Sequence, residues 1–415
     1  MSAEASLLSQ LRGLAVPQRA IPCVLMRGGT SRGPFFAAED LPDEPALRDA
    51  VLAAVMGSST GRQIDGLGGG TTVTSKVAVV SPSSHPDADV DYLFAQIDPV
   101  WGTVDTKPTC GNMLVGVGPF AIEHGLVPAG DPTTSLVVRN VNTDSFIDVV
   151  CCTPGGELTY DGDCEIDGVD GTAAPVELRF RGIEGSVTGS MLPTGCASET
   201  IRAAGLDVEA TLIDVAMPMV MVRAADLGKS GHEAPAELEA DAGFMAAMEA
   251  IRREAGQRMG LGDVSRSVVP KFGLLSAGRD GGTITSRYFT PTQCHPAHAV
   301  SGGICVAAAV VVPGTVAASL ARPVTGKADD GEARAASVAR AEGSYDAARS
   351  GESGRSVAGA ELIHVQIEHP SGSLAVALAI EHAGDGVRIV SGGVTRTARK
   401  IMSGTVHVPT VVWSG

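Results

Sequence analysis

The chain has 415 residues, of which 44% are hydrophobic and 19% are charged, and its formal net charge is −16. A chain of this length and apolar content can bury a large core, so we expect a globular protein of about two domains. The acidic balance argues against binding to nucleic acid or to an anionic membrane surface.

The sequence also bears on the location of the protein and on the state of its cysteines. No apolar stretch reaches the roughly 18 residues of a membrane span, and the first twenty residues lack the pattern of an export signal. The eight cysteines show neither a disulfide framework nor a pair with zinc spacing. We therefore expect a cytoplasmic protein with reduced cysteines.

Short runs rich in Val, Ile and Thr predict a strand-rich protein. In chain order, strands are expected at residues 21–27, 75–82, 89–97, 135–143, 146–152, 212–223, 361–369, 386–393 and 404–409. Helices are expected at residues 44–56, 113–124, 197–205, 236–259, 295–311 and 394–402. Strands and helices do not alternate regularly, which favours the α+β class over a doubly wound sheet. The polar segment 322–358 is expected to be a surface insertion or mobile loop.

The first candidate site is the Gly-rich turn MRGGTSRG that follows the strand expected at 21–27. Glycines around two hydroxyl groups allow the backbone to close on a carboxylate, and Arg27 and Arg32 could donate charge-assisted hydrogen bonds to it. The alternative is an ordinary Gly-rich turn. The spacing of a phosphate-binding loop is absent.

Two further groups follow in turns. Lys76 opens an apolar strand, where it faces either solvent or a cleft in which desolvation favours the neutral amine of a base. Cys110 precedes Gly111-Asn112 and an apolar run, so unpaired N–H groups and the helix dipole would favour the thiolate and hold an anion beside it. The alternative for Cys110 is a buried core thiol. A thiol in this setting points to proton transfer on a carboxylate.

A similar pattern occurs in the second half of the chain, where Cys294, His295 and His298 precede a helix of small residues. This hints at an internal duplication in which each half contributes one turn and one helix to a shared cleft. Metal binding by the two histidines is disfavoured, because no further ligands accompany them at ligand spacing.

Another basic group comes near the end of the chain, where Arg396, Arg399 and Lys400 lie in the helix expected at 394–402. They form either a solvated face or part of the positive pocket that an anionic substrate would need in so acidic a chain.

Six segments resemble, in this order, those of the 4-oxalomesaconate tautomerases and their relatives, the methylaconitate and aconitate isomerases: MRGGTSRGPFF, GRQIDGLGGGTTVTSKVAVV, DYLFAQI, CGNMLVGVGPFAIEHGLV, CHPAHAVSGGICVA and VTRTARKIMSG. The resemblance implies an α+β fold of two similar diaminopimelate-epimerase-like domains, each a curved sheet around a central helix, with the active site in the cleft between them. We expect these domains at residues 1–205 and 206–415, with an approximate boundary that one terminus can cross.

The resemblance also implies residue roles. Lys76 and Cys110 match the family's proton-transfer residues, and neither a metal, a flavin nor pyridoxal phosphate is expected. Two positions depart from the family: Arg32 stands where lysine is frequent, and Met217 stands where many members have asparagine. The residues expected around the substrate are Arg27, Gly28, Gly29, Thr30, Ser31, Arg32, Ser75, Gly111, Asn112, Arg287, Cys294, His295, His298 and Arg396.

The expected reaction is a 1,3-proton shift in an unsaturated keto tricarboxylate such as 4-oxalomesaconate. A C–H next to an unsaturated carboxylate is acidic because the carbanion delocalises as a dienolate, so the reaction needs a base, an acid and positive charge. Which of Lys76 and Cys110 removes the proton stays open.

Three alternatives remain. The first is cis–trans isomerisation of 2-methylaconitate or aconitate through the same allylic anion. The second is a racemase or epimerase that uses Cys110 and Cys294 from opposite faces of its substrate. The third is a non-catalytic protein that binds a small acid. In each case the expected partner is a small acid, and a homodimer is a further possibility.

Overall fold

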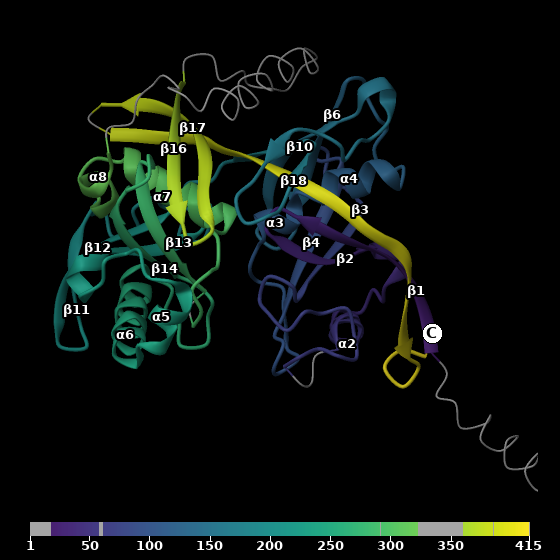
Figure 1. Ribbon diagram of the computed structural model, residues 1–415, viewed down its shortest axis with the longest axis horizontal. Helices are drawn as coiled ribbons and strands as arrows, with labels where there is room; N and C mark the ends of the chain where they lie inside the picture. Colours follow the sequence, from purple (N-terminus) through teal and green to yellow (C-terminus); the bar gives the residue numbers. More distant parts are fainter. Residues whose placement is uncertain (1–17, 58–60, 291, 323–359, 385, 415) are drawn as a thin grey trace, which may run out of the picture.

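The chain folds into two lobes that are joined by one long strand (Figure 1). The computed structural model describes residues 18–57, 61–290, 292–322, 360–384 and 386–414. The segment 322–358, expected to be an insertion, lies outside these residues except for Arg322. Within the described part of the chain, no helix is both long and apolar enough to cross a membrane.

The first lobe is a strongly curved sheet around a short helical segment. Its strands are β1 (Gln18–Gly28), β2 (Ser31–Ala37), β3 (Lys76–Pro82), β4 (Val90–Ile97), β6 (Thr133–Asn140), β7 (Ser145–Cys152) and β10 (Pro175–Arg181). The sheet closes on itself because β18 (Gly386–Pro409) pairs with both β10 and β1. Inside it lie α3 (Gly111–Leu114) and α4 (Val117–Glu123), whereas α2 (Pro45–Met56) packs on the outer face.

The second lobe continues the same sheet beyond β18. Its strands are β11 (Glu199–Ala203), β12 (Leu206–Asp214), β13 (Pro218–Arg223), β14 (Lys271–Ala277), β15 (Ile284–Phe289), β16 (Glu361–His369) and β17 (Gly372–Ala383). One face packs against α7 (Val300–Val311), which is buried along nearly its whole length, and the other against α6 (Ala242–Arg258). The smaller elements of the chain are η1 (Ala38–Asp40), β5 (Val104–Asp105), η2 (Pro154–Gly156), β8 (Cys164–Glu165), β9 (Thr172–Ala173), η3 (Ala224–Leu227), α5 (Pro235–Ala240) and α8 (Val316–Leu320).

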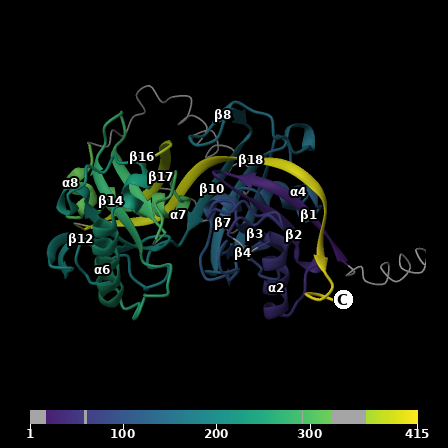
Figure 2. The ribbon, with the colours of Figure 1, turned by 60° about the horizontal axis from the view of Figure 1, so that its bottom comes forward.

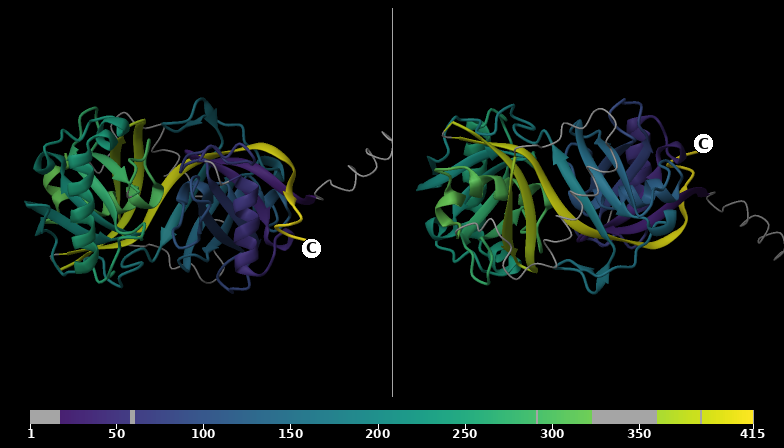
Figure 3. Two further views of the ribbon diagram at one scale, coloured as in Figure 1. Left: turned by 90° about the horizontal axis from the view of Figure 1, so that it is seen from below. Right: turned by 90° about the horizontal axis from the view of Figure 1, so that it is seen from above.

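Strand β18 ties the lobes together, and Figure 3 shows it running from one lobe into the other. Its first part pairs with β17, its middle with β10 and its last part with β1. Side chains near its middle therefore reach the junction between the lobes. The mixed sheet with few helices is the α+β class expected from the sequence.

Two segments that were expected to be helices are strands. Residues 199–203 form β11, which makes a hairpin with β12 through Ala204 and Gly205, both with positive φ. Residues 394–402 belong to β18, where the β-branched Thr395 and Thr397 pair with β10. Both helix predictions were wrong because strand pairing outweighs the local helix propensity of the alanine and arginine residues there.

Several predicted elements are present but interrupted. The strand expected at 212–223 is two strands, β12 and β13, separated by a turn at residues 215–217. The helix expected at 236–259 breaks at Asp241, whose carboxylate caps the backbone N–H of Phe244 at 2.9 Å. The helix expected from residue 295 begins only at Val300.

Candidate active site at the junction of the two lobes

The turn between β1 and β2 packs directly against the start of α3. Gly29 has a φ of 50°, and a side chain at Gly28 or Gly29 would collide with Asn112. The side-chain amide of Asn112 donates a hydrogen bond to Thr30 Oγ1 at 3.1 Å. The Gly-rich turn and the Cys-Gly-Asn turn, separated by about 80 residues in the sequence, therefore form one unit.

Two residues that were expected to contact substrate make hydrogen bonds within the loops of the candidate site. Arg27 Nη1 donates to the carbonyl oxygens of Gly29 at 3.0 Å and Thr397 at 2.8 Å, which links the turn to β18. The buried Ser75 hydroxyl donates to Gln63 Oε1 at 2.6 Å. These hydrogen bonds help to hold both loops in place.

Other polar atoms of the same unit are buried without a partner. Ser31 Oγ, Arg32 Nε and Asn112 Oδ1 accept or donate no hydrogen bond to any residue that the structure describes. Buried polar atoms are normally paired, and leaving one unpaired costs about 1–3 kcal/mol. The hydroxyl of Ser31 and the guanidinium of Arg32 are suited to donate to a carboxylate placed here.

Lys76 is the first residue of β3 and lies on the strand face that packs toward α3 and α4. Its ammonium donates to Gln96 Oε1 at 2.7 Å and lies 5.1 Å from the centroid of the Phe94 ring. The Gln96 Nε2 group donates to the carbonyls of Ser75 at 2.9 Å and Thr72 at 3.2 Å, which turns its oxygen toward the lysine. Lys76 is therefore held in place by a neutral amide and not by a carboxylate.

Cys110 occupies the N-cap position of α3, as expected from the sequence, and its side chain is half-buried. Its carbonyl oxygen accepts a hydrogen bond from the Tyr92 hydroxyl at 3.3 Å, and the preceding Thr109 accepts one from Asn140. The helix expected to follow it, at 113–124, is split into α3 and α4, so the dipole behind the thiol is that of a single turn. The first N–H groups of such a turn have no partner within the helix.

Segments of both lobes meet at this unit. Gly111, the first residue of α3, lies so close to Val300, the first residue of α7, that a Cβ atom would collide with it. A side chain at Gly168 would contact both Thr30 in the first lobe and Ala297 in the second. The candidate site therefore lies at the junction of the lobes.

Three buried histidines stand on the second-lobe side. Burial lowers the pKa of His295 and His369 to about 3 and that of His298 to about 4, so all three imidazoles are neutral near pH 7. His298 Nδ1 lies 2.9 Å from the Ala299 carbonyl oxygen, which can only accept, so Nδ1 carries the proton and Nε2 accepts from Ser286 Oγ at 3.1 Å. Among the described residues, no group of three or more His, Cys, Asp or Glu is arranged to hold a metal ion.

Arg396 lies beside these histidines, on β18 and not on the helix expected there. Its side chain is 4% exposed, and its charge acts on both His298 and His369. Burial lowers the pKa of Arg396 to about 10, so the guanidinium stays charged near pH 7. Its Nε has no hydrogen-bond partner within the described part of the chain.

Lys271 and Gln96 are site residues that the sequence analysis missed. Lys271 is the first residue of β14, is only 7% exposed, and lies close enough to Lys76 and Cys110 for their charges to act on it. Burial, reinforced by the positive charge of Lys76, lowers its pKa to about 7. A signal existed, since Lys271 opens the apolar run KFGLLSA much as Lys76 opens KVAVV. Nothing in the sequence singled out Gln96.

Cys294 does not reach this junction. It lies in an apolar cluster with Phe244 and Phe289, and burial raises its pKa to about 12. The N-cap position of α7, which corresponds to that of Cys110 in α3, is occupied by Ala299. The arrangement of two thiols facing one substrate is therefore not formed, and the cysteine spacing in the sequence was misleading.

Arg287 is also directed elsewhere. Ser286 faces His298 and α7, and because side chains alternate along β15, Arg287 points to the opposite face of the sheet. There its Nε donates to the Glu233 carbonyl at 2.8 Å. Arg287 was expected to bind a substrate carboxylate, but the structure separates it from Lys76.

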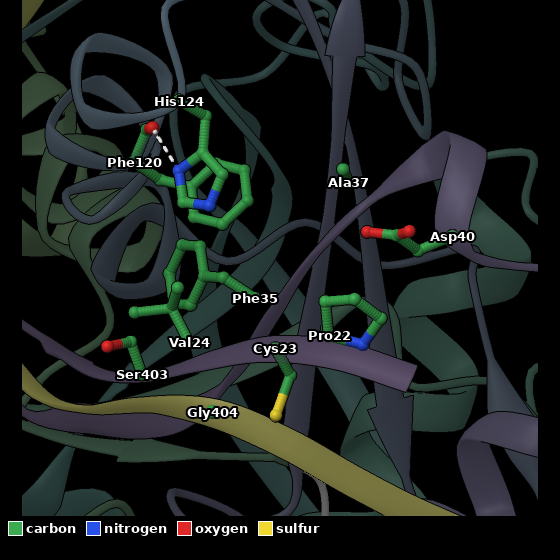
Figure 4. A pocket seen from close by; sticks show the side chains of 10 residues that line it. All are labelled: Pro22, Cys23, Val24, Phe35, Ala37, Asp40, Phe120, His124, Ser403 and Gly404. Atoms are coloured by element: carbon green, nitrogen blue, oxygen red, sulfur yellow. Dashed lines mark hydrogen bonds between the residues drawn. The ribbon is translucent and has the colours of Figure 1, made fainter. Parts of the chain in front are cut away.

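A separate pocket lies on the first lobe, away from these residues (Figure 4). Asp40 and His124 line it from opposite sides, and His124 Nδ1 bonds with the Phe120 carbonyl oxygen at 2.9 Å. Its lining residues are Pro22, Cys23, Val24, Phe35, Ala37, Asp40, Phe120, His124, Ser403 and Gly404. None of the residues discussed above as site candidates is among them.

Comparisons with known proteins identify the family of the chain. The family model described as "PrpF protein" matches residues 18–329. The chain is 41% identical over 399 residues to a 4-oxalomesaconate tautomerase of Pseudomonas putida, an alignment that covers 96% of this chain and 99% of the relative. It is 43% identical over 387 residues to a (4E)-oxalomesaconate Delta-isomerase of Novosphingobium sp., with 93% and 97% of the two chains covered.

Solved structures show the same relationship. The crystal structure of a methylitaconate-delta-isomerase matches 96% of this chain and 98% of its own, with a TM-score of 0.72 and 31% identity. A hydroxyproline epimerase from Agrobacterium vitis matches with a TM-score of 0.50 over 96% of this chain and 98% of its own; at 12% identity this shows a shared fold alone. The epimerase-like fold expected from the sequence is thus confirmed, and the chain is an isomerase that belongs to the PrpF family.

Proposed function

We propose that this isomerase catalyses a 1,3-proton shift in an unsaturated tricarboxylate of the 4-oxalomesaconate type, with Lys76 and Cys110 as the two proton-transfer groups. The reaction moves one proton and one double bond and transfers no net electrons, so it requires no redox cofactor. Its needs are a base, an acid and positive charge near the developing oxyanion.

The observation that supports the proposal is that an amine and a thiol both lie within electrostatic range of Lys271. Lys76 and Cys110 are each close enough to Lys271 for their charges to interact with it, and the backbone of Lys76 and the side chain of Met113 in α3 both border Gly33. Lys76 is bound by a neutral amide, and Cys110 is the N-cap residue of α3, a turn whose first N–H groups have no partner within the helix. Such a pair can remove a proton at one carbon and return one at another.

The surroundings suit a substrate with several carboxylates. Although the chain carries a net charge of −16, Arg32, Arg396 and Lys271 bring positive charge to the junction. The hydroxyl of Ser31 and the neutral imidazole of His369 offer further hydrogen-bonding atoms without partners in the described residues. A polyanion would supply those partners.

The proposed sequence of events is short. One of the two groups removes a proton from the carbon next to the conjugated system, and the charge spreads over a dienolate. The cations and N–H groups around α3 stabilise the oxygen that gains negative charge. The other group then delivers a proton to the third carbon, which completes the shift of the double bond.

The relatives support this substrate class. Two of them, 41% and 43% identical to this chain, are named for oxalomesaconate, and a third is named as a 3-methylitaconate isomerase at 33% identity. The higher identity to the first two favours oxalomesaconate over the smaller acid.

The test is proton NMR in D2O with 4-oxalomesaconate and, separately, with 2-methylaconitate and cis-aconitate. We expect the first to isomerise, with deuterium entering at the allylic carbon, and Cys110→Ser to slow this by about 10²- to 10⁴-fold. Cys196→Ser, which alters an exposed cysteine, is the matched control and should react at the unaltered rate. The proposal fails if none of the three acids isomerises, or if both serine variants react alike.

A further inference from the structure

The two lobes repeat one order of elements. In the first, the β1–β2 hairpin leads through α2 to β3, which lies parallel to β2; in the second, the β12–β13 hairpin leads through α6 to β14, which lies parallel to β13. Figure 2 shows α2 and α6 on the same side of their respective lobes. In this correspondence Lys76, the first residue of β3, matches Lys271, the first residue of β14.

The two lysines also share a face of their sheets. Ala78 and Val80, which alternate with Lys76 along β3, pack in the large core cluster that contains α3 and α4. Leu275, four residues after Lys271 on β14, packs in the same cluster, which also contains α7. Because side chains on one strand face occur at every second position, both lysines point toward the helices whose N-termini meet at the junction.

Lys271 differs from Lys76 in having no partner. Lys271 is only 7% exposed. Its ammonium makes no hydrogen bond or ion pair with any residue that the structure describes. Burying an unpaired ammonium is costly, and lysine is rarely buried so deeply without a partner. A group from outside the chain would remove this cost.

The charges that face Lys271 identify what it can bind. Lys76 and Arg252 are positive, and Asp105 and Cys110 are the groups that favour its charged form. The Arg252 guanidinium is itself occupied by Glu249, at 2.7 Å and 2.9 Å, and by the carbonyl of Val264 at 2.8 Å. Lys76 acts on Lys271 more strongly than Asp105 or Cys110 does, and none of the hydrogen bonds between described residues engages the Lys271 ammonium, which favours an anion as its partner.

We propose that Lys271 is a substrate-binding residue which the second lobe contributes to the site, and that its ammonium pairs with one carboxylate of the polyanionic substrate while Lys76 and Cys110 act from the first lobe. This inference rests on the proposed function for the identity of the polyanion. No bond is formed or broken at Lys271, so its role is binding and not proton transfer.

A consequence of this pairing is proton uptake. Burial and the charge of Lys76 lower the pKa of Lys271 to about 7, so the free protein at pH 8 holds this amine mostly neutral. A carboxylate bound against it favours the ammonium, because an adjacent opposite charge stabilises the charged form. Binding at pH 8 should therefore take up close to one proton, and binding at pH 6 should take up none at this group.

The experiment is titration calorimetry of the full chain with tricarballylate, a saturated tricarboxylate that cannot undergo the allylic shift. It is carried out at pH 6 and pH 8 in buffers of different ionisation enthalpy, which reports the protons taken up. Lys271→Met is expected to weaken binding about 10- to 100-fold, the effect of a lost hydrogen bond to a charged group. It should also abolish the proton uptake at pH 8, whereas Lys271→Arg should retain binding within a few-fold.

Two controls separate this role from a structural one. Lys400→Met removes an exposed lysine that pairs with Glu123 at 2.7 Å, and it should leave tricarballylate binding unaltered. Thermal unfolding should show that Lys271→Met is at least as stable as the unaltered chain, since it removes a buried charge.

The outcomes are distinct. Unaltered affinity and unaltered proton uptake in Lys271→Met would overturn the inference, as would a fall in kcat with no change in affinity. If instead Lys271→Met weakens binding while no tested acid isomerises, the proposed function fails and the anion-binding role of Lys271 stands.

Discussion

The two lobes share an architecture but carry different chemistry. At the starts of β3 and β14 both lobes have a lysine, yet at the N-cap positions of α3 and α7 the first lobe has Cys110 and the second has Ala299. The strand pairing and buried apolar residues that build the fold are alike in both, whereas a single position decides which lobe supplies a thiol. The symmetry of the fold therefore does not extend to the residues at these two N-cap positions.

The hairpin turns differ in the same way. In the first lobe Gly29 has a φ of 50° and packs against Asn112, and buried polar atoms of this unit have no partner among the described residues. In the second lobe Ala216 has a φ of 60°, and the sulfur of Met217 accepts from Tyr288 at 3.3 Å. The apolar side chain of Met217 thus covers the turn of the second lobe. Only the turn of the first lobe is therefore suited to bind a carboxylate.

The largest expected effect separates the two lysines. Lys76→Met should lower kcat by about 10²- to 10⁴-fold, because it removes a proton-transfer group, and should leave tricarballylate affinity within a few-fold. Initial rates from the NMR assay and calorimetry measure the two quantities. If Lys76→Met instead raises KM with little change in kcat, the roles assigned to the two lobes are reversed.

A second prediction concerns the amide that holds Lys76. Gln96→Glu should replace the neutral acceptor with a carboxylate, and an adjacent negative charge stabilises an ammonium relative to a neutral amine. One limb of the pH–rate profile should therefore move to higher pH: the acidic limb if Lys76 is the base, the alkaline limb if it is the acid. The position of both limbs is read from kcat measured across the pH range.

Gln96→Leu is the companion variant. It removes the acceptor without adding charge, so kcat should fall by up to about 10²-fold through misplacement of the amine, with the limbs near their original positions. An unmoved profile in Gln96→Glu would contradict proton transfer by Lys76.

The difference between the lobes also explains which site residues could be predicted from the sequence. Lys76 follows a Gly-rich stretch and Cys110 follows the turn residues Pro108 and Thr109, each before an apolar run, and such boundaries are visible without a structure. Lys271 stands at an equivalent boundary, but the strand that follows contains Gly273 and was not predicted. A site residue was therefore missed together with the element that positions it.

Cys294 illustrates the opposite error. Its spacing from Cys110 and its place before a helix suggested equivalence, but it lies five positions before the N-cap of α7 and its side chain enters an apolar cluster. Tertiary packing decides against which face of a sheet an irregular segment packs. Local sequence patterns do not predict that face.

A third prediction tests the contact between the lobes. Gly111→Ala would drive a methyl group into Val300, and overpacking of this kind costs about 1–3 kcal/mol. We expect a lower Tm and a smaller fall in kcat than in the Gln96 variants, since the junction opens slightly. Gly404→Ala, where no atom lies within 4 Å of the new Cβ, should leave both unaltered. Equal Tm values for the two variants would mean that α3 and α7 do not meet as described.

The smallest effect is expected at Cys294, and it bears most directly on the difference between the lobes. Cys294→Ala removes a buried sulfur from the cluster with Phe244 and Phe289, so it should lower stability by about 1 kcal/mol and kcat by less than about three-fold. Cys110→Ala should do the reverse, with a large loss of kcat at little cost in stability, because its thiol is only half-buried. Chemical denaturation and the NMR assay measure the pair of quantities for both variants. A loss of kcat in Cys294→Ala comparable to that in Cys110→Ala would restore the two-thiol mechanism and require the segment before α7 to turn toward the junction during turnover.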